Sequence, residues 1–308
     1  MCFDSRILAI GVMSNVVELD QVTKTFGPQV AVNRLDLSIP EGTVYGFIGP
    51  NGSGKTTTIR MILRIFFPDS GRVSVLGADQ GSAADDRLGY LPEERGLYRK
   101  MIVRDVIEFF GKLKGLRNCR REAEEWLARL GLADSAKKRV DGLSKGMSQK
   151  VQFISAVIAR PKLLILDEPF SGLDPVNMEL LKDTILDLRK QGTTVLFSTH
   201  DMHVAEKMCD RVCMIYKGNK VLDGTLAEIK GQYGLDTLRI RVGDATCLRN
   251  LQGVVQVNDY GQYQELRLES NGDSQAVLKQ VLSHTTLDHF ERTSPSLHDI
   301  FVRIAGAA

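Results

Sequence analysis

The segment TVYGFIGPNGSGKTTTIRMILRIF, residues 43–66, constrains the fold more than any other part of the chain. An apolar run leads into a glycine-rich turn and then a helical pattern, and the turn fits G-x-x-x-x-G-K-[ST] with Gly49, Gly54, Lys55 and Thr56. Glycines allow a tight turn whose backbone N–H groups point inward at phosphate oxygens. The alternative, a plain glycine turn, does not require a strand before it and a helix after it. The segment therefore predicts an α/β fold with a nucleotide phosphate site at a strand–helix junction.

Each polar residue of this turn has an expected role. Lys55 would neutralise the β- and γ-phosphates, and the Thr56 hydroxyl would ligate Mg²⁺. The positive N-terminal end of the following helix points at the same charge. The residues expected to contact the nucleotide are Gly49, Asn51, Gly52, Ser53, Gly54, Lys55, Thr56 and Thr57.

A second set of polar residues follows two other apolar runs. The run LLILDE ends in Asp167 and Glu168, which places carboxylates at the carboxyl edge of a predicted parallel sheet, where ligands bind in α/β proteins. Asp167 would hold Mg²⁺ through water, and Glu168 would polarise an attacking water as a general base. His200 ends the run TTVLFSTH and could reach a γ-phosphate. The alternatives are two acids that cap a strand and a structural histidine.

Composition narrows the class of protein. The 308 residues carry a formal charge of +2, so no strong field indicates a nucleic-acid partner. Five scattered cysteines favour a reducing compartment over a disulfide scaffold. No run approaches the roughly 18 apolar residues of a membrane span, and the first residues lack the basic region of a signal peptide. We expect residues 1–15 to be a loose N-terminal extension.

The chain is expected to hold two domains. Residues 16–230 alternate apolar runs with helical patterns, and the part from about 85 to 155 is mostly helical in pattern. After about Gly231 the pattern becomes β-α-β-β-α-β followed by a final helix, SLHDIFVRI. This order fits a small α+β domain of the ferredoxin-like type over residues 231–308.

Several motifs occur together in one order: GPNGSGKTT, YLPEERGLY, LSKGM, ILDEP, SGLD and STHD. In this respect residues 16–224 resemble the ATP-binding subunits of ABC transporters. The resemblance implies a P-loop NTPase fold with a mixed sheet core and a helical subdomain, binding of ATP and Mg²⁺, and ATP hydrolysis. It also accounts for LSKGM, because in that family two subunits face each other head to tail. Ser144 and Gly146 would then contact the ATP held by the partner subunit.

The resemblance assigns further roles. Phe26 matches the aromatic residue that stacks on adenine, although a core residue at a strand end is the alternative. Asp174 matches a loop that couples the two sites, and His200 matches a histidine that senses the γ-phosphate. Glu93 stands where the family normally has a metal-binding glutamine, and its carboxylate would bind Mg²⁺ more strongly than an amide.

The differences from the usual pattern point to a subgroup. Glu93, Lys145, Met147 and the C-terminal appendage resemble ABC-2-type exporters. That resemblance implies a second ATP-binding subunit and a multi-span membrane permease as partners, with the chain cytoplasmic and peripheral on the inner face of the membrane. The alternative is a soluble ABC-type ATPase that acts on the ribosome or on DNA, although such proteins usually carry two modules or long coiled coils. A regulatory role of the C-terminal domain would add to transport.

Overall fold

The computed structural model describes residues 14–79, 86–94, 96–233, 237–269 and 272–306. Most of the expected N-terminal extension lies outside these ranges. The chain divides into two compact units between Asp223 and Gly224. The sequence pattern places this boundary after residue 230, whereas the contacts assign helix α7 (Leu226–Tyr233) to the second unit.

The first unit is built on a six-stranded sheet in the order β10-β9-β3-β8-β7-β6. Every residue of β3, β7 and β8 is buried, so these strands form the centre of the sheet. The pairs β3–β8, β3–β9, β7–β8 and β6–β7 are all parallel. In chain order the strands are β3 (Val44–Ile48), β6 (Leu88–Leu91), β7 (Leu163–Asp167), β8 (Thr194–Thr199), β9 (Arg211–Tyr216) and β10 (Asn219–Thr225).

A second, antiparallel sheet lies against helix α1 (Lys55–Ile62). Its strands are β1 (Asn15–Phe26), β2 (Gln29–Pro40), β4 (Ser70–Val75) and β5 (Ala78–Asp79), in the order β2-β1-β4-β5. One apolar core joins α1 to both sheets through side chains such as Val17, Phe47 and Ile59. The mixed-sheet core predicted from the sequence is therefore present, with β4 and β5 in addition.

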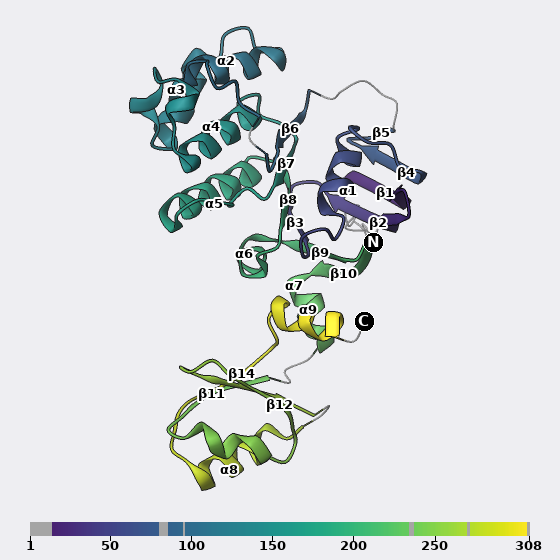
Figure 1. Cartoon of the computed structure of the whole chain (residues 1–308), viewed down its shortest axis with the longest axis vertical. Coiled ribbons are helices and arrows are strands. Elements are labelled where there is room, and N and C mark those ends of the chain that lie inside the picture. Colours follow the sequence, from purple (N-terminus) through teal and green to yellow (C-terminus); the bar gives the residue numbers. More distant parts are fainter. Residues whose placement is uncertain (1–13, 80–85, 95, 234–236, 270–271, 307–308) are drawn as a thin grey trace, which may run out of the picture. The chain divides into compact units, whose positions relative to one another are not determined.

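Helices α2, α3 and α4 gather on the side away from the antiparallel sheet (Figure 1). They span Val103–Leu113, Arg120–Arg129 and Lys145–Val157, with short 3-10 turns at Ala133–Ser135 and Val140–Gly142. The predicted helical part is correct except at its start. Residues Leu88–Leu91 form β6, because this short apolar stretch pairs with β7.

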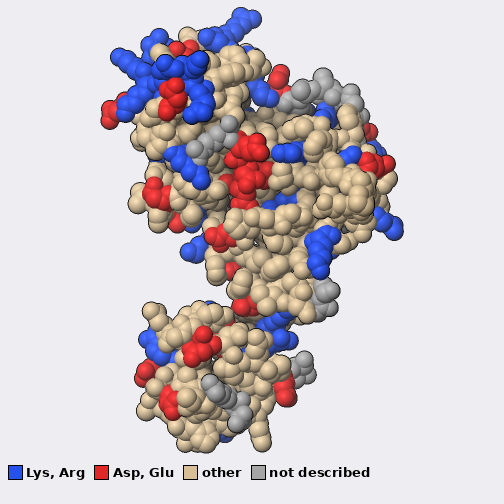
Figure 2. Space-filling view, in the orientation of Figure 1, with Lys and Arg blue, Asp and Glu red and all other residues tan. Residues whose placement is uncertain are grey.

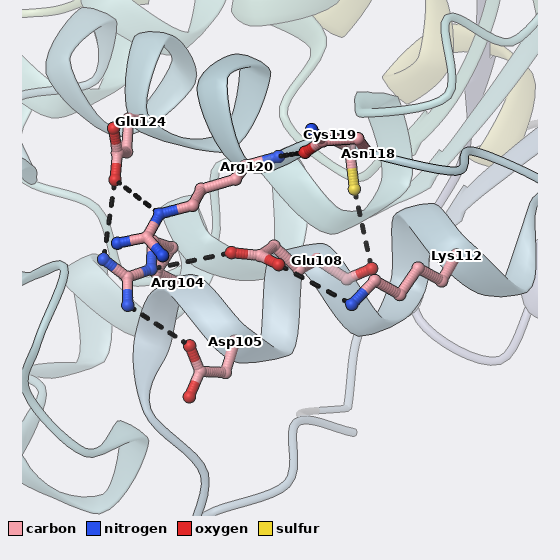
Figure 3. Close-up of polar contacts among 8 residues, drawn as sticks. All are labelled: Arg104, Asp105, Glu108, Lys112, Asn118, Cys119, Arg120 and Glu124. Carbon is pink, nitrogen blue, oxygen red and sulfur yellow. Dashed lines mark hydrogen bonds and ion pairs between the residues drawn. The ribbon is translucent and has the colours of Figure 1, made fainter.

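Arg104 holds α2 against α3 (Figure 3). Its side chain is only 16% exposed, and it lies 3.5 Å from Glu124 of α3, 3.6 Å from Glu108 and 3.7 Å from Asp105. Glu124 also pairs with Arg120 at 3.4 Å. Removing a guanidinium from most of its water costs less when carboxylates lie beside it, so the contact with Glu124 favours one arrangement of the two helices.

Basic side chains crowd the surface over α2 and α3 (Figure 2). Many belong to the basic run GKLKGLRNCRR, yet they have acidic neighbours. Lys112 lies 3.7 Å from Glu108, and Arg121 lies 2.9 Å from Glu125. Such exposed pairs are typical of a solvated helix face and contribute little free energy.

The remaining helices of the first unit begin at aspartate caps. Asp174 caps α5 (Pro175–Lys190), and Asp201 caps α6 (Met202–Met208). Each carboxylate accepts hydrogen bonds from backbone N–H groups of the first turn, which have no partner within the helix. Cys209 and Cys213 are buried, free thiols, and burial raises the pKa of both.

The second unit has the predicted ferredoxin-like arrangement. Its antiparallel sheet runs β12-β13-β11-β14, so β13 separates the parallel strands β11 and β12. The elements are β11 (Thr237–Val242), a 3-10 helix (Ala245–Asn250), β12 (Val254–Asp259), β13 (Gln264–Leu268), α8 (Ser274–His284), β14 (Leu287–Thr293) and α9 (Leu297–Gly306). Helix α8 covers one face of the sheet (Figure 1) and buries Val277 and Val281 there. Leu282, placed on the same face by its spacing, is instead 56% exposed.

No helix in the described ranges has the length and apolar character needed to cross a membrane.

We expect Leu266→Ala to destabilise the second unit alone. Leu266 is fully buried in that unit's own core, so its truncation should lower the free energy of unfolding by about 2–5 kcal/mol. The matched variant Leu282→Ala, on an exposed position, should change it by less than about 0.5 kcal/mol. Amide hydrogen exchange in β11 and β13 measures the effect. Equal acceleration in β3 and β7 would show that the two units unfold together.

Candidate functional site

The candidate site forms where the parallel strands end. Strand β3 runs into Gly49, β7 ends at Asp167, β8 ends one residue before His200, and β6 ends two residues before Glu93. These strands lie in the order β3-β8-β7-β6 and point the same way. Their carboxyl ends therefore meet at one edge, which is where ligands bind in α/β sheets.

The glycine loop depends on backbone shapes that other residues adopt poorly. Gly54 precedes α1 with φ 110°, and a Cβ atom there would lie 2.4 Å from the backbone oxygen of Ala31. At Gly49, φ is 152° and a Cβ would lie 2.2 Å from the oxygen of Ile215. Contacts from two other strands thus require glycine at both ends of the loop.

Lys55 is the first residue of α1, and its side chain folds back onto this loop. Its Nζ donates to the backbone oxygens of Gly49 at 2.7 Å and Pro50 at 3.0 Å. Burial lowers the pKa of the Lys55 ammonium, and the nearby carboxylates of Glu168, Asp167 and Glu93 partly oppose that shift. The ammonium is therefore held where phosphate oxygens would meet it.

Asp167 has one satisfied oxygen and one free oxygen. Its Oδ1 accepts a short hydrogen bond from Ser198 Oγ of the neighbouring strand β8. Its Oδ2 is buried and has no hydrogen-bond partner among the described residues. A buried carboxylate oxygen left unpaired costs free energy unless a cation or another donor reaches it. The role of Ser198 was not predicted, although a serine in a fully buried strand is a usable signal.

Glu168 has an unusual backbone and a close histidine. Its φ is 49°, a left-handed value that is rare for a residue with a side chain. Its backbone N–H lies 3.2 Å from Ser198 Oγ, which anchors this turn. His200 Nδ1 lies 2.9 Å from Glu168 Oε1, so the imidazole donates to the carboxylate. The histidine side chain is 58% exposed, whereas that of Glu168 is 11% exposed.

One cavity of about 430 Å³ collects most of the predicted residues. Its lining includes Phe26, Asn51, Gly52, Gly54, Lys55, Thr56, Thr57, Glu93, Asp167 and Glu168, together with the unpredicted Gln29 and Ala31. Gln29 and Ala31 start β2, whose alternating pattern carries no signal of ligand contact. Gly49, Ser53 and His200 adjoin the cavity in sequence without lining it.

Phe26 is held at the rim of this cavity. It is 46% exposed and packs edge-on against Phe66 with ring centroids 5.7 Å apart. Asp69 fixes the end of β1 beside it, because it accepts hydrogen bonds from the Lys24 ammonium and from Thr25. These bonds lower the pKa of Asp69 to about 2. An exposed ring held in place beside a phosphate cradle suits base stacking.

The donor set fits a magnesium ion that is bound together with a nucleotide. Thr56, Glu93 and Asp167 line both this cavity and an adjoining hollow, and Asp167 supplies the unpaired oxygen. Among the described residues, no group of three His, Cys, Asp or Glu side chains could hold a metal ion by itself. Mg²⁺ usually takes one or two carboxylates and completes its shell with phosphate oxygens and water.

The LSKGM segment lies apart from this cavity. Ser144 caps α4 and accepts a hydrogen bond from the Met147 N–H at 3.3 Å, so the helix begins at Lys145. Neither Ser144 nor Gly146 is among the described residues that line the cavity. The segment instead packs on the SGLD loop, where the Lys145 side chain covers Gly172.

Family models match both units. The ABC transporter model matches residues 32–171, and the model "ATP-binding protein DrrA1-3-like, C-terminal domain" matches residues 224–305. The uncharacterized ABC transporter ATP-binding protein YhaQ of Bacillus subtilis strain 168 is 43% identical over 295 residues, which cover 95% of this chain and 99% of that protein. The chain belongs to the ATP-binding subunits of ABC transporters.

This ABC subunit also resembles an export protein and a solved ATPase structure. The Nod factor export ATP-binding protein I of Sinorhizobium fredii strain NBRC 101917 / NGR234 is 35% identical, over 94% of this chain and 86% of that protein. An ATP-binding cassette solved as a dimer in a post-hydrolysis state with ADP and phosphate is 26% identical with a TM-score of 0.63. That match covers 68% of this chain and 98% of the solved one. The ABC subunit binds ATP and is an ATPase of this class.

We expect Gly54→Ala to distort the loop and Gly52→Ala to be milder. Both glycines have positive φ, but only at Gly54 would the added Cβ meet backbone, whereas nothing lies within 4 Å at Gly52. Gly52→Ala should therefore cost only the left-handed backbone term of about 1 kcal/mol, and Gly54→Ala should cost at least about 2 kcal/mol. Chemical denaturation of the nucleotide-free protein measures both. Equal losses would show that contact with Ala31 does not determine the loop.

Proposed function

We propose that this subunit powers an ABC-2-type membrane exporter by closing a dimer around ATP. In each of two composite sites, the P-loop of one subunit holds the nucleotide and the LSKGM segment of the other covers it. Hydrolysis reopens the dimer, and a bound permease converts the cycle into transport.

The division of the site between two places in one unit supports the dimer. Residues of the phosphate cradle, the carboxylates and Phe26 line a single cavity. Ser144 and Gly146 lie outside that lining, although their hydroxyl and backbone donors suit a γ-phosphate. A second copy that faces the first would complete both cavities by the same contact, as a twofold dimer requires.

The loop and α1 bind the nucleotide. Backbone N–H groups from Asn51 to Thr57 and the Lys55 ammonium cradle the phosphates, and Phe26 stacks on the base. Thr56, Asp167 and Glu93 would hold Mg²⁺ beside the bound phosphates. When bound, Mg²⁺ neutralises charge that develops on the phosphate oxygens.

Glu168 and His200 carry out the hydrolytic step. Glu168 accepts a proton from water while the water oxygen attacks the γ-phosphorus in line. The bond from the γ-phosphorus to the bridging oxygen breaks, and ADP and phosphate leave. His200 orients the Glu168 carboxylate through their 2.9 Å contact, and from the end of β8 it would sense the γ-phosphate. Asp174, at the N-terminus of α5, connects one site with the other.

An apolar groove beside the site is the candidate place for the permease. It has a volume of about 730 Å³ and is lined by residues that include Phe67, Leu97, Phe110, Leu113 and Gln152. Phe67 and Leu113 are 59% and 61% exposed, which is unusual for large apolar side chains. The groove borders the segment that carries Glu93, so an occupant would lie next to the metal ligand.

The comparisons favour export over a ribosomal or DNA role. The related Nod factor protein is named for export, and the second unit matches a domain model named after DrrA-type ATP-binding proteins. The proposal places the subunit in the cytoplasm, peripheral on the inner face of the membrane, with a multi-span permease and a second ATP-binding subunit. No nucleic-acid partner is expected.

Glu168→Gln should trap an ATP-dependent dimer. The amide keeps the shape of the side chain but cannot accept the proton, so hydrolysis should fall by at least about a hundredfold while ATP still binds. Size-exclusion chromatography with multi-angle light scattering, with ATP and with ADP, measures the dimer. A variant that remains monomeric at saturating MgATP would show that the active partner is a different chain.

Glu93→Gln should weaken the dependence on metal rather than on nucleotide. Loss of one carboxylate from the magnesium shell should raise the Mg²⁺ concentration for half-maximal ATPase activity several-fold, by about 3–10 times. Glu122→Gln in α3 is the control, because Glu122 lines neither the phosphate cavity nor the adjoining hollow. Identical Mg²⁺ curves for the wild type and Glu93→Gln would remove Glu93 from the metal site.

Substitutions in the groove should separate ATP hydrolysis from permease binding. We expect Phe67→Ser with Leu113→Ser to keep ATP-dependent dimerisation in the Glu168→Gln background, because both side chains are exposed. The tagged variant should lose the multi-span protein that co-purifies with the native chain from mildly solubilised membranes. Leu282→Ser, an exposed apolar position in the second unit, is the control. Recovery of ribosomal or DNA-repair proteins in place of a permease would refute the exporter.

A further inference from the structure

Helix α4 connects the LSKGM segment to the loops around the site through three buried polar side chains. Gln149 Nε2 donates to the backbone oxygen of Pro169, next to Glu168, at 3.2 Å. Gln152 Nε2 donates to the backbone oxygen of Glu94, next to Glu93, at 3.1 Å. The third side chain, Lys150, makes the most unusual contacts, because it brings a charge into the interior.

The Lys150 ammonium joins three helices. Lys150 is 6% exposed, and its Nζ donates to the backbone oxygen of Leu130 at 2.7 Å and to Asn177 Oδ1 at 2.8 Å. Leu130 closes the C-terminus of α3, where the helix dipole favours a cation. Asn177 lies in the first turn of α5. One side chain thus connects α3, α4, which begins in the LSKGM segment, and α5, which follows the SGLD loop.

Asn177 extends the chain of hydrogen bonds to Asp174. Its Nδ2 donates to Asp174 Oδ2, while Asp174 Oδ1 accepts the backbone N–H groups of Val176 and Asn177. The Asn177 amide thereby accepts from a cation and donates to a carboxylate. This polarity orders the three residues as Lys150, Asn177 and Asp174, and the arrangement cannot be reversed.

Burial of the Lys150 ammonium costs folding free energy. Desolvation lowers the pKa of Lys150, and the charge of Asp174 partly opposes the shift. No carboxylate within the described residues forms a direct ion pair with Lys150. An apolar residue would fill the same space at lower cost, so the charge specifies an arrangement rather than adding to stability.

We propose that Lys150 is a positioning residue that fixes the LSKGM segment and the Ser171–Asp174 loop as one block. Under the proposed function, both elements belong to the part of the site that covers the nucleotide held by the partner subunit. The same two elements also touch nearer the surface. There the Lys145 side chain lies over Gly172, and Gly146 lies beside Leu173. Lys150 is not among the described residues that line the phosphate cavity, and it acts through Asn177 and Asp174.

The test compares binding within one subunit with closure between two. Lys150→Met, which keeps length but removes the donors, should leave the affinity of the monomer for a fluorescent ATP analogue within about twofold. In the Glu168→Gln background it should raise the dissociation constant of the ATP-dependent dimer about tenfold, and in the wild type it should lower kcat by a similar factor. Lys150→Arg, which keeps charge and donors, should restore most of both.

Two further variants control for folding. Lys182→Met removes another buried lysine, one that pairs with Glu179 and not with α4, and should leave the dimer unchanged. Asn177→Leu removes the hydrogen bonds that link Lys150 to Asp174. Asn177 is half-buried, so this variant tests the inference even if Lys150→Met misfolds. Added to Lys150→Met, it should cause no further loss, because both break the same connection.

The outcomes separate this inference from the proposed function. If Glu168→Gln alone forms no ATP-dependent dimer, the proposed dimer is wrong. If it forms one and Lys150→Met or Asn177→Leu leaves it unchanged, only the role of Lys150 is wrong. Additive losses in the double variant, or equal losses of monomer affinity and dimer affinity, would also overturn it, because they indicate a general structural defect.

Discussion

Parallel pairing of β3, β8, β7 and β6 is the constraint on which the site depends. The order of these strands differs from their order in the chain, so residues more than a hundred positions apart end at one edge. Gly49, Asp167, His200 and Glu93 each lie at the carboxyl end of a different strand of that edge. Ser198 then joins two neighbouring strands by contacting both Asp167 and the backbone of Glu168.

The site gathers three buried charged side chains, those of Lys55, Asp167 and Glu168. Lys55 is buried among carboxylates, Asp167 has an oxygen without a partner, and Glu168 sits on a left-handed backbone. These features cost folding free energy and are of the kind that functional sites retain. Under the proposed function, bound phosphate and Mg²⁺ would balance these charges. The rigid strands beneath hold that arrangement in advance, which is the main requirement of phosphoryl transfer.

Helix α4 connects the LSKGM segment to loops of its own subunit's site. Its N-terminal end faces outward, while Gln149, Lys150 and Gln152 hold its buried side to the loops that carry Glu168, Asp174 and Glu93. Gln152 also lines the apolar groove. A displacement of the helix would therefore act on several parts of the site together, and the polar contacts make that connection specific in direction and register.

The sequence by itself determined the nucleotide chemistry, most strands and helices, and the ferredoxin-like order of the second unit. These follow from local rules, since a phosphate loop needs glycines at fixed spacing and strands need alternating or continuous apolar runs. It did not determine that β6 belongs to the parallel sheet, that Leu282 is exposed, or that Ser198, Gln29 and Lys150 face the site or its supports. Those facts depend on which distant segments pack together. The sequence does not distinguish a buried lysine from a surface lysine. Only the tertiary structure decides which lysine is buried and needs hydrogen-bond partners.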